Sequence, residues 1–289
     1  MAKAKDLAWR ALRALAGFAK ALKVSYRDIE VGIDSEPEKG LADNGDLAND
    51  LSALLQAAGE AAKQEETALL LFIDELQYIH EVDLEALIAS LHRCAQRQLP
   101  VALVGAGLPQ LRGKMGEAKS YAERLFDFPE MGPLSRYASD QALVIPAQEE
   151  GVDFDQAALE RIYQETKGYP YFIQEWGKHS WDVATASPIT LSNVIDAGRE
   201  TIAALDESFF RVRFDRLTPQ EKDYMRAMAE LGVGPHRSGD IASELKKGVT
   251  RLAPIRSGLI AKGMIYSPAH GETAFTVPLF DEFMRRIMP

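Results

Sequence analysis

Two adjacent carboxylates, Asp74 and Glu75, directly follow a run of six apolar residues at positions 68–73. A run of this length is too short to cross a membrane, but it is typical of a strand buried on both faces of a parallel sheet. Ligands of open parallel sheets bind just beyond the carboxyl ends of the strands, so both acids are expected where a ligand site would be built. The alternative is a core strand followed by a helix that starts with acidic residues, which the helix dipole favours.

A group of small residues stands at the end of the next apolar run. Residues 101–104 read Val-Ala-Leu-Val and lead into a Gly-Ala-Gly turn that contains Gly105 and Gly107. Such a turn lets a ligand or another backbone come close. Residues 143–145 form a further short apolar run, and residues 83–98 have the spacing of an amphipathic helix. Strands that alternate with helices predict a parallel α/β sheet with right-handed crossovers.

Composition limits the classes of protein that this chain can be. Its 289 residues are enough for two domains, and 46% hydrophobic with 26% charged residues is ordinary for a soluble globular protein. No apolar run reaches the length of a membrane span, so no membrane partner is expected. A single cysteine, Cys94, excludes an internal disulfide and a multi-cysteine metal site, which favours a cytoplasmic location.

Charge is unevenly distributed along the chain. The net charge of −10 argues against a protein that coats nucleic acid along its whole length. From residue 217 onward, ten Lys and Arg stand against eight Asp and Glu, which gives this part +2 and leaves −12 for the part before it. A nucleic-acid contact is therefore expected only in the last part of the chain.

The first 60 residues contain two helical patterns and a strand pattern. Residues 3–23 predict an amphipathic helix whose basic residues lie outside its apolar face. We favour a helix that packs on a sheet; the alternative is a segment that targets the protein to a membrane surface or an organelle. Residues 26–33 alternate like a short strand. Asp46 is placed to cap a helix over residues 47–58.

The later part of the chain reads as mostly helical. Residues 155–204 have helical spacing, and residues 205–216, dense in aromatic residues and arginines, connect them to a second domain. Thr218, Pro219 and Glu221 form a capping box with proline at the first helical position, which predicts a helix start.

Two further helices, at residues 238–245 and 250–262, precede two short strands at residues 263–266 and 274–277. Three helices followed by a hairpin resemble a winged helix. Five basic residues and no acid lie in the expected third helix and just before it: Lys246, Lys247, Arg251, Arg256 and Lys262. Such a helix can enter the major groove of DNA, where arginine reads guanine and lysine contacts phosphate. The alternative is a protein-interaction or oligomerisation module with a solvated basic face.

The order of these motifs resembles a known family. Residues 26–210 resemble the AAA+ and STAND ATPases, most of all the branch that includes archaeal and bacterial ATPases related to origin-recognition proteins. Asp74 and Glu75 match the Walker B motif of this family, and residues 101–107 match its sensor 1 strand and turn. The Tyr-Ala-Glu-Arg-Leu-Phe segment around Arg124 resembles the segment that carries an arginine finger.

The resemblance implies roles for these residues and for two in the helical lid. Asp74 would hold Mg²⁺ through its water shell, Glu75 would orient the attacking water, and Gly105 and Gly107 would lie beside bound ATP. Arg124 would act across the interface of a homo-oligomer. Gly168 and Pro170, which resemble the Gly-x-Pro element of the lid, would couple its position to the nucleotide. The alternatives are a solvated arginine at position 124, and a glycine and a proline that simply end one helix and begin the next.

One motif of the family is missing. No Gly-x-x-x-x-Gly-Lys-Ser/Thr occurs, and the nearest string, at residues 107–115, has one residue too many, lacks the hydroxyl and follows the wrong strand. Nothing else in the sequence offers the backbone N–H groups and lysine that cradle the β and γ phosphates. We therefore expect a sheet without its P-loop strand, and a functional protein in which about 100 residues carrying that loop precede Met1.

Taken together, the sequence predicts an α/β fold with three parts. Residues 1–150 would form an incomplete AAA+-like parallel-sheet core, residues 151–216 a helical lid and connector, and residues 217–289 a winged-helix domain. The expected function is an ATP-binding switch in which the nucleotide changes the relation of the lid to a DNA- or protein-binding winged helix. ATPase activity is expected only with a Walker A segment upstream, so this chain alone would be inactive. The alternative is a non-enzymatic scaffold or DNA-binding protein that retains the fold.

Overall fold

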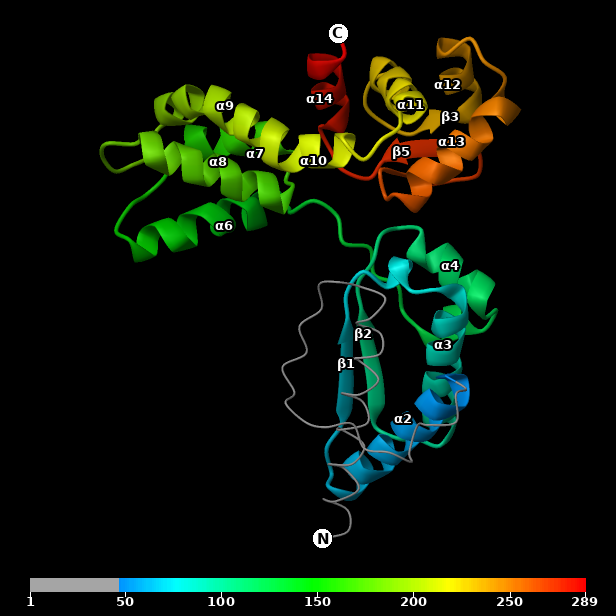
Figure 1. Ribbon diagram of the computed structural model, residues 1–289. Coiled ribbons are helices and arrows are strands. Elements are labelled where there is room, and N and C mark those ends of the chain that lie inside the picture. The colour runs from blue at the N-terminus through cyan, green and yellow to red at the C-terminus, as the bar shows by residue number, and fades with distance from the viewer. Residues whose placement is uncertain (1–46) are drawn as a thin grey trace. The chain divides into compact units, whose positions relative to one another are not determined.

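The computed structural model describes residues 47–289, which are coloured in Figure 1. The helix expected at residues 3–23, the strand expected at residues 26–33 and the capping residue Asp46 lie outside the described residues. The chain divides after Pro129 into unit 1 and unit 2, and each unit is described by itself.

Unit 1 contains a short parallel sheet and its helices. Its described elements are α2 (Leu47–Gln64), β1 (Leu69–Ile73), the 3₁₀ turn η1 (Leu76–Tyr78), α3 (Glu81–Gln96), β2 (Val101–Gly105), α4 (Leu111–Ala118) and α5 (Ala122–Leu125). The strands β1 and β2 pair in parallel, with Leu69 opposite Val101 and Ile73 opposite Gly105. The connection through α3 is the strand-helix-strand unit that the apolar runs predict.

One face of this sheet packs on the core of unit 1. Leu69, Leu71 and Ile73 lie against a cluster that includes the buried Leu55 and Leu84 of α2 and α3, and Figure 1 shows both helices on the same side of the strands. The apolar run at residues 68–73 is therefore not buried on both sides as predicted. Its alternate residues point away from the helices, and Leu70 and Phe72 are 54% and 73% exposed.

Unit 2 is built mainly from helices. Its elements are α6 (Arg136–Glu149), α7 (Gln156–Thr166), α8 (Pro170–Val183), α9 (Leu191–Leu205), the π-helical turn η2 (Asp206–Phe210), α10 (Arg211–Phe214), α11 (Pro219–Glu230), β3 (His236–Arg237), α12 (Ser238–Glu244), α13 (Val249–Ala261), β4 (Ile265–Tyr266), β5 (Glu272–Phe275) and α14 (Phe280–Ile287). The helices predicted for residues 155–204 are present as α7, α8 and α9.

The strand predicted at residues 143–145 is wrong, because these residues lie inside α6. Ser135 caps this helix by accepting a hydrogen bond from the Ala138 amide. Leu143 is buried in the helical bundle. A short apolar run does not distinguish a strand from one turn of a buried helix, and here the cap and the helical surroundings decide.

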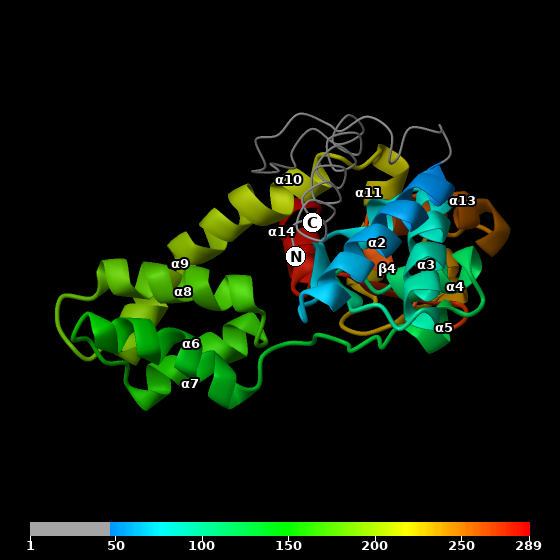
Figure 2. The same ribbon diagram turned by 90° about the horizontal axis from the view of Figure 1, so that it is seen from below.

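The bundle and the tail of unit 2 share one aromatic core. Phe172 of α8 lies 5.5 Å from Phe210 of η2 between ring centroids, and Phe210 stacks on Phe283 of α14 at 5.2 Å. Figure 2 shows α9 leading into α10 beside α14. The buried cluster runs without interruption from Leu143 to Met284, so the bundle and the tail are packed as one body.

The tail has the helices and the two-stranded hairpin that its sequence predicts, with the second strand at Glu272–Phe275 instead of 274–277, and one strand, β3, that was not predicted. Thr218 and Glu221 form the predicted capping box at the start of α11, and Pro219 takes the first helical position. The strands form an antiparallel sheet in the order β3-β5-β4, with α11, α12 and α13 in the same part of the chain and α14 after it. Within residues 47–289, no helix combines the length and the apolar character that a membrane crossing requires.

Candidate functional site

The acid pair stands at the carboxyl end of β1, as the sequence predicts. Asp74 is exposed, and its Oδ1 accepts a hydrogen bond from the backbone N–H of Glu75 at 2.8 Å. Glu75 is also exposed and adopts a left-handed backbone conformation with φ of 55°. Non-glycine residues adopt this conformation rarely, and they do so mostly in tight turns and at functional sites. Both carboxylates are therefore accessible to a ligand at the end of the strand.

Backbone hydrogen bonds lock the ends of the two strands together. The Ala106 amide donates to the Ile73 carbonyl at 2.9 Å, and the Leu76 amide donates to the Ala106 carbonyl at 3.0 Å. These bonds hold the turn after β2 against the turn after β1. The small-residue turn and the acid pair, separated by about 30 residues in sequence, thus form one edge of the sheet.

The glycines of the β2 turn serve this close approach. A Cβ atom at Gly105 would lie 2.2 Å from Leu76 Cδ1, and one at Gly107 would lie 2.7 Å from Gln77 Oε1. The structure thus places other parts of the chain beside both glycines, where the sequence left open a ligand or another backbone. Their predicted contact with ATP remains a prediction.

Gln77 links the acid pair to the β2 turn, and sequence reasoning missed it. Its Nε2 donates a hydrogen bond to Glu75 Oε2, and its Oε1 accepts one from the Leu108 amide at 3.1 Å. The side chain is buried in η1, although glutamine is usually exposed. In the sequence, the only indication of this role is a polar residue two positions after Glu75, inside an otherwise apolar turn.

Lys114 supports the same turn from α4. Its ammonium donates to the carbonyls of Gln77, at 2.7 Å, and Ile79. The lysine of the string at residues 107–115 is thus directed to the backbone after β1. This geometry agrees with the rejection of that string as a P-loop.

Arg124 lies in the short helix α5 and is exposed. In the described part of the chain, no hydrogen bond or ion pair joins it to Asp74 or Glu75. A role between subunits is compatible with such an exposed arginine, but nothing in the geometry of unit 1 requires it.

Gly168 and Pro170 belong to unit 2, where they form the turn between α7 and α8. Gly168 has φ of 77°, its carbonyl accepts a hydrogen bond from the Leu134 amide at 2.8 Å, and a Cβ here would lie 2.6 Å from the Leu134 carbonyl oxygen. Pro170 is the first residue of α8. The turn itself thus explains why a glycine and a proline occur at these positions. Their coupling to a nucleotide remains a prediction.

Two of the five basic residues predicted to bind DNA are held by contacts inside unit 2. Arg256 donates to Thr273 Oγ1 at 2.9 Å and to the Glu272 carbonyl at 2.8 Å, which ties α13 to β5. Lys262 pairs with Glu221 at 2.6 Å. The other three, Lys246, Lys247 and Arg251, are exposed around the start of α13.

The Lys262 pair changes the acidity of its partner. Burial alone would raise the pKa of the Glu221 carboxyl, but hydrogen bonds from Lys262 and Thr218 lower the pKa below its usual value. Glu221 is 6% exposed, whereas the Lys262 side chain is 37% exposed, so the carboxylate end of this pair is buried and the predicted DNA contact of Lys262 remains a prediction. For metals, the described residues contain no group of three or more His, Cys, Asp or Glu side chains placed to hold an ion.

Comparisons with known proteins address the family and the fold. A family described as a domain of unknown function (DUF8462) matches residues 207–284, from η2 into α14. No curated protein sequence matches the chain. Among solved structures, the Walker-type ATPase PABY2304 of Pyrococcus abyssi is similar with a TM-score of 0.61 and 16% identity, over 95% of this chain and 77% of that chain.

Two other solved structures show weaker similarity. A mutant of Thermotoga maritima RuvB has a TM-score of 0.43 and 19% identity over 78% of this chain and 71% of that chain. Cdc6p from Pyrobaculum aerophilum has a TM-score of 0.38 and 12% identity over 93% and 76%. Because their TM-scores are below 0.5, these two structures do not indicate a shared fold. The likeness to the Walker-type ATPase concerns the fold alone: this chain has a fold similar to that of a Walker-type ATPase.

Proposed function

We propose that this chain is a nucleotide-responsive ATPase-type module whose acid pair contacts Mg-ATP and whose tail is a winged helix that contacts DNA or a protein. The observation that carries the proposal is the position of Asp74 and Glu75. They stand at the locked carboxyl ends of two parallel strands, where ligands of such sheets bind, in a chain with an AAA+-like fold.

The residues present fit the metal ion better than the phosphates. Magnesium is usually held by one or two carboxylates, several waters and substrate phosphates, and the exposed Asp74 offers such a carboxylate. In this proposal Glu75, which accepts a hydrogen bond from Gln77, would accept a proton from a water molecule. The sequence, however, has no Gly-rich loop to cradle the phosphates, so we derive no hydrolysis by these residues alone.

Element order supports the winged-helix part of the proposal. Three helices, α11 to α13, precede the β4-β5 hairpin, and β3 adds a third strand to it. In this assignment α13 is the recognition helix, and the exposed Lys246, Lys247 and Arg251 are the groups available to phosphates and bases. Arg256 and Lys262 would act by holding the helix in place.

The shared core of unit 2 indicates how a nucleotide signal would travel. Because Phe172, Phe210 and Phe283 join the bundle to the tail, movement of the lid against the winged helix would break this packing. In place of a movement of the lid against the winged helix, we propose that unit 2 responds to the nucleotide as one body. An oligomer that uses Arg124 between subunits remains part of the proposal.

Calorimetric titration of the purified chain with Mg-ATP tests the proposal. We expect binding that requires Mg²⁺ and is lost in Asp74→Asn. The matched control is Asp83→Asn, at an acid in the first turn of α3. Binding that persists unchanged in Asp74→Asn, or no binding to the unaltered chain, would contradict a nucleotide site at the acid pair.

A second candidate is a non-enzymatic DNA-binding protein that retains the ATPase-like fold. The missing phosphate loop favours it. Removing phosphate contacts reduces the slope of log affinity against log salt by about 1 per contact, so Lys246→Ala with Arg251→Ala should flatten the salt dependence of duplex DNA binding by about 2. An unchanged slope in this double variant would remove DNA from the proposal and leave a protein as the partner of the tail.

A further inference from the structure

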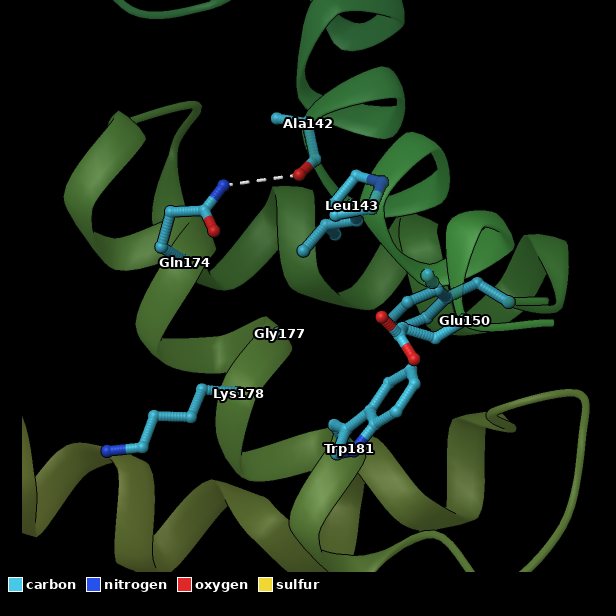
Figure 3. A pocket seen from close by; sticks show the side chains of 10 residues that line it. Ala142, Leu143, Glu150, Gln174, Gly177, Lys178 and Trp181 are labelled. Carbon is cyan, nitrogen blue, oxygen red and sulfur yellow. Dashed lines mark hydrogen bonds between the residues drawn. The ribbon is translucent and has the colours of Figure 1, made fainter. Parts of the chain in front are cut away.

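A cavity of about 270 Å³ lies between α6 and α8 in unit 2 (Figure 3). A proline in α6 shapes the contact between these helices. Pro146 has no N–H to donate to the Ala142 carbonyl four residues earlier, and Gln174 of α8 donates to that carbonyl instead, at 3.2 Å. Gly177 lets α8 come close, because a Cβ there would lie 2.4 Å from Leu143 Cδ2. The cavity walls are therefore fixed by the helix-helix contact itself.

The walls of the cavity are apolar, with few charged groups around them. Its lining residues are Ala142, Leu143, Pro146, Ala147, Glu150, Phe154, Gln174, Gly177, Lys178 and Trp181. Trp181 is 39% exposed, which is unusual for an indole that neighbours a packed core. Among the described residues, the Glu150 carboxylate forms neither an ion pair nor a hydrogen bond. Figure 3 shows Glu150 beside the Trp181 ring, with the Lys178 ammonium directed away from both.

An aromatic face beside a carboxylate, over an apolar floor, is complementary to a cation on an apolar stem. Cations bind over the face of tryptophan more strongly than over other rings. The planar guanidinium of arginine stacks on such a face while it pairs with a carboxylate, and its aliphatic stem can lie along apolar side chains such as Leu143 and Ala147. Lysine matches this geometry less well, because its ammonium is compact and strongly hydrated.

The surroundings favour a polypeptide over a free small cation. Ile145 of α6, which precedes the lining residue Pro146 in sequence, is 51% exposed, and exposed apolar side chains on the same helix offer contact area that a free cation does not use. Exposed tryptophans at the centre of small apolar patches are also frequent anchors of protein interfaces. We propose that this cavity binds an arginine side chain of a partner polypeptide, with the guanidinium between Trp181 and Glu150. The proposal is independent of the nucleotide site.

Titration of the full chain with two peptides tests the proposal. The probe is acetyl-Leu-Arg-Leu-amide, and its neutral isostere has citrulline in place of arginine. We expect the arginine peptide to bind at least about tenfold more tightly, as loss of one charge-assisted contact implies, and to change the fluorescence of Trp181. Equal affinities for the two peptides would overturn the proposal. Agmatine that binds as tightly as the arginine peptide would overturn the assignment to a polypeptide.

Variants locate the binding to this cavity. Glu150→Gln should weaken the arginine peptide about tenfold, whereas Glu149→Gln, at an exposed neighbour that does not line the cavity, should change its affinity less than about twofold. Trp181→Leu should reduce the affinity about fivefold by calorimetry while circular dichroism confirms that the helices remain. Equal effects of the two glutamate substitutions, or no effect of Trp181→Leu, would contradict the site.

Discussion

The described phenylalanine side chains of the two units are buried to very different extents. In unit 2, Phe172, Phe210 and Phe283 are at most 2% exposed; they lie on α8, η2 and α14, and Phe210 contacts the other two rings. In unit 1, Phe72 stands on the open face of the sheet and is 73% exposed. Since burial of apolar area is the main source of folding free energy, phenylalanines of the two units make unequal contributions. Unit 2 is therefore stabilised by a closed aromatic core, whereas β1 packs against apolar side chains on one face only.

Truncating one phenylalanine in each unit tests the comparison most strongly. Phe172→Ala should lower the free energy of unfolding of unit 2 by about 3–5 kcal/mol, because it leaves a cavity in a closed core. Phe72→Ala should lower that of unit 1 by less than about 1 kcal/mol. Urea unfolding followed by the fluorescence of Trp176 and Trp181, in a Trp9→Phe background, reports on unit 2, and hydrogen exchange of α3 reports on unit 1. A comparable loss in both units would show that the open face of β1 is covered in solution.

Glycine substitutions sharpen the description of unit 2. Gly168→Ala forces an alanine into a left-handed conformation, at about 1–2 kcal/mol, and drives its Cβ against the Leu134 carbonyl. Gly151 has a similar φ of 74° but open space around it. Gly151→Ala should therefore lose only the free energy needed to hold an alanine in the left-handed conformation. The thermal midpoint of unit 2 should fall further in Gly168→Ala. Equal midpoints in the two variants would mean that the turn moves away from Leu134 without cost.

The sequence predicted elements whose signals are local. Two strands followed from uniform apolar runs, and the start of α11 followed from the capping box at Thr218 and Glu221. Residues 143–145 were mistaken for a strand because three apolar residues have no measurable period. The open face of β1 was missed for a related reason, since an uninterrupted apolar run does not say how many of its sides are covered.

In the candidate site, too, the sequence predicted the residues with a local signal and missed those whose role depends on distant contacts. The position of Asp74 and Glu75 followed from their place after a strand, and the structure puts them there. Gln77 was missed because its role depends on the Leu108 amide, about 30 residues away in sequence. Arg256 was interpreted as a DNA contact because its partner, Thr273, lies on a different element. Charge and spacing identify a polar residue, but only tertiary contacts tell whether it faces a ligand or the protein.

Gln77 provides the corresponding test in unit 1. Gln77→Leu removes the acceptor of the Leu108 amide and leaves that partly buried N–H without a protein partner, which should lower the stability of unit 1 by about 1 kcal/mol. Gln96→Leu, at an exposed glutamine of α3, is the control and should have little effect. Hydrogen exchange at residues 105–108 measures the difference. Unchanged exchange in Gln77→Leu would show that backbone bonds alone hold the strand ends together.

The smallest expected effect is a dependence on pH that concerns unit 2. The pKa of Glu221 is lowered in the folded protein, so its carboxylate stabilises unit 2 at pH values above the ordinary pKa of a glutamate, and this contribution disappears as the pH falls through the lowered pKa. The thermal midpoint of unit 2 should therefore decrease in acid. In Glu221→Gln this decrease should be shallower, because the neutral amide does not titrate and takes up no proton on unfolding. If the two proteins lost stability in parallel as the pH fell, the Lys262 pair would not be what joins α13 to α11, and the closed core alone would account for the stability of the tail.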